Sequence, residues 1–498
     1  MGVSIRTLSG RDIALPDDAI DGLRGSLHGR LLTSGSTGYD EARTIWNAMV
    51  ERRPALIARC IDAQDVATAV RFARENSLLT SVRGGGHNIA GNAVSDDGFM
   101  IDLSPMRAVQ VDATRRIARV EGGATLADVD RATQEHGLAT PLGINSTTGI
   151  AGLTLGGGFG WLSRRLGLTS DNLVAADVVN AAGERIRASK TENAELFWGL
   201  RGGGGNFGVV TSFEFQLHQV GPTVLAGLIV HPLDDAKEVI RFYRQFAPES
   251  PEELACWFVM RKAPPLPFLP AAWHGREILV LAACYSGDIA DGERILKPLR
   301  QFGRPIADVI GPQPYAAWQT ILDPLLTPGM RNYWKSHDFL DVSDGLIDVF
   351  TDFARRLPDE QTEIAFAQLG GAINRLTIGD SAYARREAQY LVNVHCRWAD
   401  PARDDACVRW ARELFAAAAP FSTGSVYVNF LTGDEESRVR AAYGANYDRL
   451  VALKNRFDPT NLFRVNQNIR PTAFTLPTAG APERCGKMSD IRRACRYP

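Results

Sequence analysis

Residues 83–91 read Arg-Gly-Gly-Gly-His-Asn-Ile-Ala-Gly and follow directly on the apolar run Leu78–Val82. A short apolar run bounded by glycine predicts a buried strand, and the three glycines predict a loop at its end. Glycine tolerates positive φ and lets a ligand approach the backbone, so this loop suits a phosphate or a flat ring held by main-chain amides. A lone histidine is usually a satisfied surface or core residue, but in this loop His87 becomes a candidate functional group.

The pattern around this loop predicts an α/β unit that continues to about residue 218. Apolar runs alternate with helical spacing, and Val209–Leu217 alternates apolar and polar residues as a half-buried strand does. From about residue 221 to 425, proline-rich loops separate further elements, which indicates a second domain. The other expected elements are strands at Ala55–Cys60, Leu78–Val82, Phe99–Leu103, Ile117–Glu121 and Ile278–Ala283, helices at Asp65–Glu75, Leu126–His136 and Asp344–Arg356, and a helical segment at Glu435–Arg456.

The composition excludes several classes of protein. With 498 residues, 45% of them apolar and 22% charged, the chain is neither disordered nor fibrous. Its net charge of -2 provides no field that would hold nucleic acid or an anionic membrane surface. No apolar run reaches the roughly 18 residues of a membrane span, and the first residues lack the apolar core of an export signal, so we expect a cytoplasmic protein. The seven cysteines are scattered without a CxxC pair, so neither a disulfide framework nor a metal site is expected.

Two further glycine clusters lie at residues 156–160 and 202–208. The second cluster matches GxGxxG at Gly203, Gly205 and Gly208, but a strand is expected after it where a dinucleotide-binding motif needs a helix. A Rossmann site is therefore rejected. The chain has neither GxxxxGK[ST] nor GxSxG, which leaves P-loop and serine-hydrolase functions without their key residues.

The residues around His87 resemble the covalent-flavin motif of the vanillyl-alcohol-oxidase / p-cresol-methylhydroxylase superfamily. They fit its berberine-bridge-enzyme-like branch, and within it the bacterial members that resemble 6-hydroxynicotine oxidases. The likeness covers most of the chain. Further matching motifs, in chain order, are Leu142–Asn145 through Gly160–Leu162, Leu168–Asn172, Glu195–Gly202, Asn206–Thr211, Tyr427–Phe430, and Phe457–Pro459 through Asn466–Ile469.

This resemblance implies an α+β fold of two domains. The FAD-binding domain, of the PCMH type, would be split between residues 1–220 and 426–471. The inserted residues 221–425 would form the substrate-binding domain, an antiparallel sheet covered by helices. Residues 472–498 would form a tail extension. The proline-rich loops that begin near residue 221 agree with this division.

The resemblance also implies FAD joined through its 8α-methyl group to His87. Family members with a second link carry a cysteine where this chain has Asn145, so a single covalent link is expected. Leu153 stands where plant members often have histidine. The remaining cofactor contacts implied by the resemblance are Arg83, Gly84, Gly85, Gly86, Asn88, Gly91, Gly143, Asn145, Thr147, Gly149, Gly152, Gly157, Gly160, Asp171, Asn172, Val210, Asn429, Asn466 and Asn468.

For the catalytic base, Tyr427 in Tyr-x-Asn-Phe matches the tyrosine of sugar-oxidising and anthracycline-oxidising relatives, with a packing role as the alternative. A phenol with a pKa of about 10 is protonated at neutral pH, so a cation must lower its pKa or it must share its proton with the departing one. Lys335 and Arg375 are candidates for that cation and for the substrate pocket, although surface ion pairing is the commoner role of such residues. Tyr383 is a third pocket candidate.

The function implied is an FAD-dependent oxidase. Hydride would pass from a C–H of a small organic substrate, an alcohol, an amine or a sugar hemiacetal, to the flavin, and then to dioxygen as hydrogen peroxide. One alternative is a dehydrogenase of the same fold that uses another acceptor, and a second, of a different class, is a non-catalytic flavin-binding protein. No motif specifies an oligomeric state.

Overall fold

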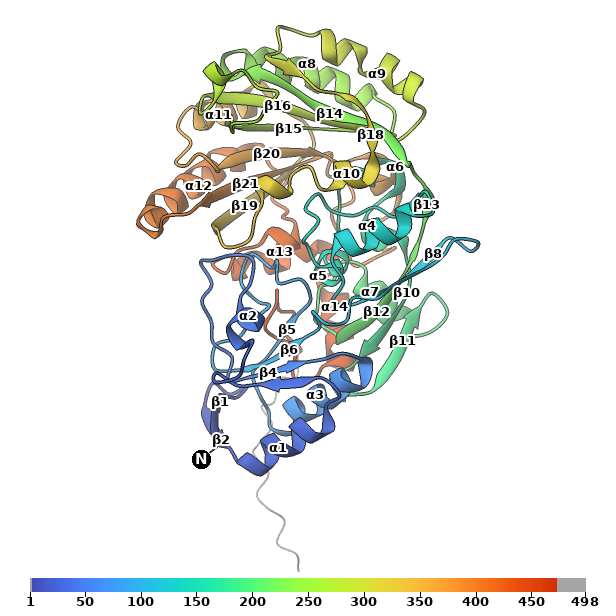
Figure 1. Cartoon of the computed structure of the whole chain (residues 1–498), viewed down its shortest axis with the longest axis vertical. Coiled ribbons are helices and arrows are strands. Elements are labelled where there is room, and N and C mark those ends of the chain that lie inside the picture. The colour runs from blue at the N-terminus through green and yellow to red at the C-terminus, as the bar shows by residue number, and fades with distance from the viewer. Residues whose placement is uncertain (1, 473–498) are drawn as a thin grey trace, which may run out of the picture.

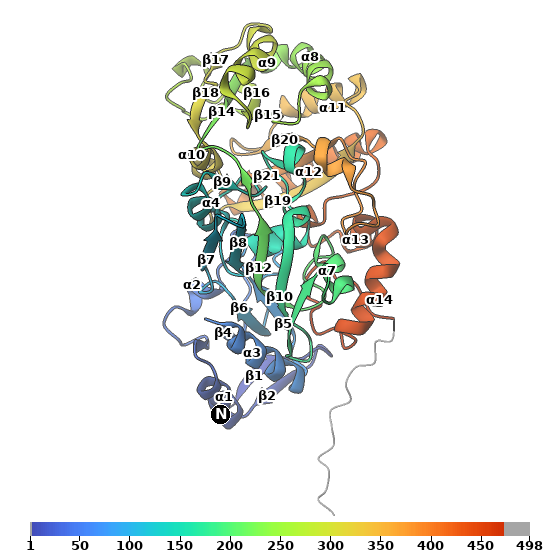
Figure 2. The same ribbon diagram turned by 90° about the vertical axis from the view of Figure 1, so that its right-hand side faces the viewer.

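The computed structural model describes residues 2–472, so the tail extension expected at 472–498 lies outside the described residues except for its first position. Figure 1 shows an elongated molecule with the N-terminal elements at one end and an eight-stranded sheet with its helices at the other. The C-terminal helices α13 (Val439–Tyr443) and α14 (Tyr447–Phe457) return to the N-terminal half (Figure 2). Mixed helices and mainly antiparallel sheets confirm the predicted α+β fold.

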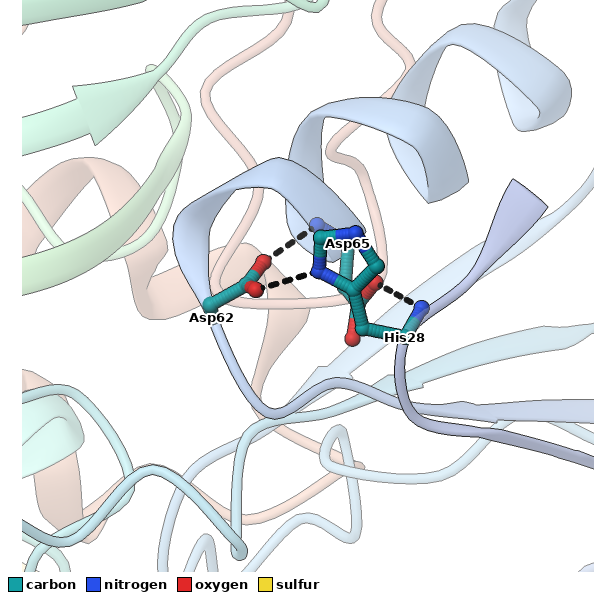
Figure 3. A group of neighbouring side chains, drawn as sticks. All are labelled: His28, Asp62 and Asp65. Carbon is teal, nitrogen blue, oxygen red and sulfur yellow. Dashed lines mark hydrogen bonds and ion pairs between the residues drawn. The ribbon is translucent and has the colours of Figure 1, made fainter.

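A four-stranded sheet precedes the histidine loop. Its order is β3 (Arg30–Leu32), β4 (Leu56–Arg59), β6 (Phe99–Asp102) and β5 (Thr80–Arg83). β4 and β5 both run parallel to β6, and helix α3 (Ala63–Glu75) connects β4 to β5, as the strand–helix–strand pattern predicts. Asp62 caps α3 by accepting from the amides of Gln64 and Asp65, and Asp65 accepts from the His28 amide (Figure 3). These hydrogen bonds fix where α3 begins.

A five-stranded antiparallel sheet carries the second half of the N-terminal region. Its order is β11 (Arg185–Ser189), β10 (Leu173–Val179), β12 (Val209–Gln216), β8 (Ile117–Glu121) and β7 (Val109–Asp112). The N-terminal region also contains two separate two-stranded sheets. One pairs β1 (Val3–Arg6) with β2 (Asp12–Leu15), and the other pairs β9 (Leu138–Ala139) with β13 (His218–Gln219). The helices here are α1 (Asp17–Ser26), α2 (Tyr39–Arg43), α4 (Leu126–Gln134), α5 (Ile150–Leu155), α6 (Ser163–Leu166) and α7 (Ala194–Leu200).

The eight-stranded sheet takes all its strands from residues 223–398. Its path is β17 (Ala307–Asp308), β14 (Thr223–Pro232), β16 (Glu277–Tyr285), β15 (Leu254–Lys262), β20 (Glu363–Gln368), β21 (Tyr390–Trp398) and β19 (Arg331–Phe339), and β18 (Gly311–Pro314) also pairs with β14. The helices of this region are α8 (Ala236–Glu249), α9 (Ile289–Gln301), α10 (Tyr315–Gln319), α11 (Asp344–Ala354) and α12 (Asp404–Ala418). These strand ranges support the division of domains that we propose at residues 220 and 425.

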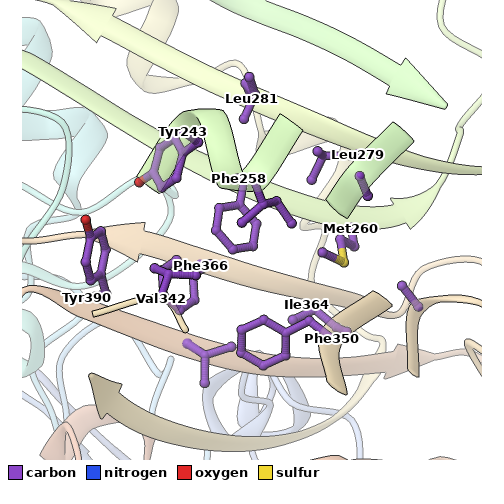
Figure 4. Packing of buried hydrophobic residues seen from close by; sticks show 14 of the residues in the cluster. Tyr243, Phe258, Met260, Leu279, Leu281, Val342, Phe350, Ile364, Phe366 and Tyr390 are labelled. Carbon is purple, nitrogen blue, oxygen red and sulfur yellow. The ribbon is translucent and has the colours of Figure 1, made fainter. Parts of the chain in front are cut away.

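This sheet has one face packed on helices and one face turned toward the N-terminal half. Because side chains alternate along a strand, Phe258 and Met260 of β15 join the core beneath α8 and α11, whereas Trp257 and Val259 point to the other side. Figure 4 shows the helix-side core, in which the ring of Phe366 stacks on Phe258 with centroids 4.5 Å apart. The core on the helix side holds the strands rigidly, so the side chains on the free face keep fixed positions.

The predicted helical segment at Glu435–Arg456 contains two α-helices, α13 and α14. Helix α13 ends at Tyr443, and Gly444 adopts a φ of +50° before α14 begins at Tyr447. Residues in that backbone region interrupt a right-handed helix, which is why the chain turns there. The predicted helix at Leu126–His136 ends at Gln134, with Gly137 at a φ of +63° shortly after it.

A buried lysine of the C-terminal segment, Lys454, pairs with Asp458 of the same segment and also bonds to the N-terminal half. The ammonium of Lys454 donates to Asp458 Oδ2 at 2.8 Å and to the carbonyl oxygens of Asn206 and Phe463 at 2.8 and 2.9 Å. Both charged side chains are fully buried, and Asp458 also accepts from the amides of Leu462 and Phe463. Every proton of this ammonium therefore has an acceptor, which compensates the cost of burying the charge.

Lys454→Met should destabilise the protein by about 3–5 kcal/mol, because it leaves the Asp458 carboxylate buried without its cation. Thermal and urea unfolding of the purified protein would measure the loss. Arg440→Met, which removes the exposed ion pair of Arg440 with Asp448, serves as the control and should leave the melting temperature almost unchanged. Equal melting temperatures for the two variants would show that the buried ion pair does not stabilise the protein.

Candidate functional site

A cavity of about 410 Å³ lies between the glycine loops and the free face of the eight-stranded sheet. Its walls combine the loop after β5, the loop before α5, the glycine cluster at residues 204–208, the stretches 427–430 and 465–467, and the sheet. Segments far apart in sequence thus converge on one space. The predicted site residues that line it are Gly84, Gly85, Gly86, His87, Asn88, Gly143, Asn145, Gly149, Gly152, Val210, Tyr427, Asn429 and Asn466.

The glycines of this cavity fit a phosphate-bearing flat cofactor. Within the described part of the chain, none of the amide N–H groups of residues 84–88 donates a hydrogen bond, so they remain available to a ligand. A Cβ added at Gly152 or Gly205 would project into open space, where it would take volume from the cavity. Amides suit the pyrophosphate of FAD, and the side-chain-free floor leaves room for its ring.

His87 is held in the cavity wall by three neighbours. Its ring stacks on Trp46 with centroids 5.1 Å apart and an interplanar angle of 21°. Nε2 lies 2.9 Å from Thr147 Oγ1, and Nδ1 lies 3.4 Å from Thr148 Oγ1. Burial lowers the pKa of His87 to about 3, so the imidazole is neutral at physiological pH. A neutral imidazole keeps one nitrogen lone pair free for covalent attachment.

Tyr427 reaches the cavity from the chain that precedes α13. Its side chain is buried, and its oxygen accepts from the Gly158 amide at 3.0 Å and from Asn429 Nδ2 at 2.9 Å. Burial raises the pKa of Tyr427, while these two hydrogen bonds and the nearby Arg385 guanidinium oppose the rise. The O–H proton finds no acceptor among the described residues.

The other predicted cofactor residues do not line the cavity. Thr147 contacts His87, as described above. Arg83 donates to the carbonyl oxygen of Ala42, Asp171 accepts twice from Arg386, and Asn172 donates to the carbonyl oxygens of Leu166 and Leu168. The structure places Gly91, Gly157, Gly160 and Asn468 outside the lining as well.

The structure places neither predicted cation beside Tyr427. Lys335 is buried, but its ammonium pairs with Asp434 at 2.9 Å and Glu435 at 3.2 Å, away from the cavity. The neighbouring Trp334 lines the cavity instead, because adjacent residues of a strand face opposite sides. Arg375 is mostly exposed and pairs with Glu252. Neither residue therefore occupies the pocket position expected from the sequence.

The cation that does lie near Tyr427 is Arg385. Its guanidinium is 5.6 Å from the Tyr427 ring centre and 5.7 Å from that of Tyr383, and it pairs with the buried Asp338. Tyr383 is itself buried, with its ring centre 6.4 Å from that of Tyr427, outside the cavity lining. Burial lowers the pKa of Arg385 to about 9, which still leaves it charged at neutral pH.

Sequence reasoning missed the residues that the eight-stranded sheet contributes to the cavity. Arg261, Trp334, Glu363, Asn393 and His395 all line it, each from a strand of that sheet. No local motif marks them. β15 reads LACWFVMRK and β20 reads EIAFAQ, so neither strand alternates apolar and polar residues, and the sequence did not indicate which face would lie over the cavity.

Comparison with known proteins matches two family models to the chain. One, described as an FAD binding domain, matches residues 54–189, and the other, described as berberine and berberine like, matches residues 426–470. Among residues 2–472, no helix is long and apolar enough to cross a membrane.

Curated relatives and solved structures agree with these models. An FAD-linked oxidoreductase of Dictyostelium discoideum is 32% identical over 451 residues, which span 90% of this chain and 95% of the relative. (R)-6-hydroxynicotine oxidase of Paenarthrobacter nicotinovorans is 31% identical over 460 residues, spanning 90% and 97%. The crystal structure of 6-hydroxy-D-nicotine oxidase from Arthrobacter nicotinovorans superposes with a TM-score of 0.80 at 29% identity, over 89% of this chain and 98% of that one. The chain therefore belongs to the berberine-bridge-enzyme-like family of FAD-linked oxidoreductases in the vanillyl-alcohol-oxidase superfamily.

Proposed function

We propose that this oxidoreductase is an oxidase that takes hydride from a C–H of a small organic substrate and gives the electrons to dioxygen, forming hydrogen peroxide. The substrate group oxidised would be an alcohol, an amine or a sugar hemiacetal. Bound FAD supplies the hydride acceptor. The observation that carries the proposal is the Tyr427 hydroxyl in the cavity wall, with two hydrogen bonds donated to its oxygen and its own proton unengaged.

Tyr427 would act as the phenolate, its own proton passing first to solvent, and would then take the proton that leaves the substrate O–H or N–H as the hydride departs. The donors Gly158 N and Asn429 Nδ2 hold its oxygen in place and stabilise negative charge on it. Arg385 adds a positive charge near the ring. These three groups work against the burial that keeps the phenol protonated, so Tyr427 is suited to share a proton in the transition state.

We further propose that FAD is linked to His87, and to no second residue. The neutral imidazole and its contacts with Trp46 and Thr147 support His87 as the attachment point. None of the five described cysteines lines the cavity, and Asn145 stands in its wall where a second link would need a thiol. The relative that oxidises 6-hydroxynicotine supports an oxidase over other oxidoreductases.

His87→Ala should turn a covalent flavin into a dissociable one. The parent protein should stay yellow after acid precipitation, with the flavin mass on the peptide that contains His87, whereas the variant should release its flavin into the supernatant. The native variant should keep FAD bound, because the free amides of the glycine loop remain. His136→Ala, at an exposed histidine outside the cavity, is the control. A colourless parent precipitate, or a flavinylated cysteine peptide, would contradict the proposed link.

Tyr427→Phe should slow anaerobic flavin reduction by about a hundredfold to ten-thousandfold, the usual contribution of a positioned general base. Reoxidation by air should hardly change, since dioxygen needs no help from the phenol. The rate of reduction in the parent should rise by about tenfold per unit from about pH 7 to about pH 9, because the raised pKa leaves little phenolate at neutral pH. The variant should lose this dependence.

Tyr383→Phe provides the matched control for this substitution, since Tyr383 is a buried neighbour outside the cavity lining. It should leave reduction at the parental rate. Tyr427→Phe also leaves the Gly158 amide without its acceptor, so a destabilisation of about 1–3 kcal/mol is expected and should be measured alongside. A parental reduction rate in Tyr427→Phe would make Tyr427 a packing residue, and the base would then be sought among Tyr383, if Tyr383→Phe slows reduction, other side chains of residues 221–425, or a bound water.

An anaerobic screen of alcohols, amines and sugars tests the activity itself. A substrate should bleach the flavin, and admission of air should restore the absorbance with one equivalent of hydrogen peroxide per flavin. Fast bleaching with slow return in air, but rapid reduction of an artificial dye, would identify a dehydrogenase. Absence of bleaching with every compound would favour a flavin-binding protein without this activity.

A further inference from the structure

The free face of the eight-stranded sheet presents three rows of side chains to the cavity. The pairing register aligns Trp257 with Ala282, Val259 with Val280, and Arg261 with Ile278 across β15 and β16. Continued across β20 and β21, the rows take in Ala367 and Leu391, then Ala365 and Asn393, then Glu363 and His395. The first row is apolar except for the indole N–H of Trp257, the second carries one carboxamide, and the third carries the charges.

The charged row is satisfied within the protein. Arg261 Nη1 lies 2.7 Å from Glu363 Oε2, and Glu363 Oε1 lies 3.1 Å from His395 Nδ1. His395 Nε2 in turn lies 3.3 Å from Asn332 Oδ1. Arg261 and Glu363 are the only residues with a permanent charge in the described lining, and they neutralise each other. The wall therefore provides no unpaired charge for an ionic ligand.

Asn393 differs from its neighbours in the wall. The residue is only 9% exposed, yet its Oδ1 has no hydrogen-bond partner, and its Nδ2 donates to no group of the described residues. Ser336, opposite it on β19, makes no bond to it. Ala365, its partner on β20, is too small to cover it. A buried carboxamide without partners costs free energy, and a ligand with a matching polar group would recover it.

We infer that Asn393 recognises the polar end of a neutral, ring-containing substrate whose remaining surface is apolar, and that the polar end is a hydroxyl or a carbonyl group. The apolar rows of Trp257, Val259 and Leu391 would contact the ring, and the carboxamide would bind its single polar group. This inference deepens the proposed function and rests on it, since it names the class of molecule that supplies the hydride.

The same wall disfavours two other substrate classes. An oligosaccharide presents several hydroxyls and needs a matching number of free polar groups. Among the described residues, this face offers the carboxamide of Asn393 and the indole N–H groups of Trp257 and Trp334, which are too few and are surrounded by apolar residues. A carboxylic acid or a cationic amine needs a counter-charge, and the charges of Arg261 and Glu363 are already engaged with each other. A neutral molecule with one polar end fits the remaining chemistry.

Equilibrium dialysis of the oxidised holoenzyme against 2-naphthol and naphthalene tests the inference. Neither compound has an alcohol or amine C–H to oxidise, so binding is measured without turnover. The hydroxyl should tighten binding by roughly three- to tenfold, the value of one hydrogen bond, and Asn393→Leu should bring the ratio of the two affinities to about one. Asn393→Ser, a shorter polar variant, should weaken 2-naphthol binding while leaving naphthalene binding unchanged. Cellobiose and 2-naphthoate should show no saturable binding.

Ala365→Val is the matched control, because it narrows the wall beside Asn393 without changing its polarity. It should weaken binding of both naphthalene and 2-naphthol and preserve their ratio. An unchanged ratio in Asn393→Leu, no binding of 2-naphthol, or tighter binding of cellobiose would each overturn the inference. If 2-naphthol binds as expected while no compound ever bleaches the flavin, the recognition by Asn393 stands and the proposed oxidase activity fails.

Discussion

The contact between Gly85 and Gly149 is the constraint on which the rest of the site depends. A Cβ at either position would lie 2.3 Å from the backbone nitrogen of the other, so only glycine lets the two loops touch. One loop leaves the end of β5, and the other leads into α5. Their contact brings Thr147 beside His87 and leaves a row of unbonded amides along the cavity floor.

The eight-stranded sheet separates stability from recognition by using its two faces differently. Its helix side is a continuous apolar core that includes Phe258, Phe350 and Phe366, and this core holds the strands in register. Its cavity side carries small residues such as Ala365 beside the single free carboxamide of Asn393. A substitution on the cavity side of the sheet changes the side chains that a substrate would contact, but it removes no contact of the helix-side core. The same sheet can therefore accommodate different substrates.

Tyr427 lies in the wall of the cavity between the glycine loops and the eight-stranded sheet, and its burial affects both its position and its pKa. The same packing that aims its oxygen at the cavity raises its pKa, and the donors Gly158 and Asn429 offset part of that rise. The C-terminal segment that follows Tyr427 is tied to the N-terminal half by the buried ammonium of Lys454, which donates to the carbonyl oxygen of Asn206 while it pairs with Asp458. The catalytic geometry therefore depends on charges buried well away from the cavity.

Local pattern alone predicted the strand–helix–strand unit around α3 and the glycine loop of His87, because helical spacing and turn chemistry depend on near neighbours in sequence. The α+β class followed from the family resemblance. Motif resemblance indicated the flavin and Tyr427. The face of β19 on which Lys335 lies and the approach of Arg385 to Tyr427 needed the folded chain. By itself, the sequence determined which elements form and which cofactor they suit. Only the tertiary structure decided which side chains reach the cavity, because the direction of a side chain in a strand is set by register with strands distant in the chain.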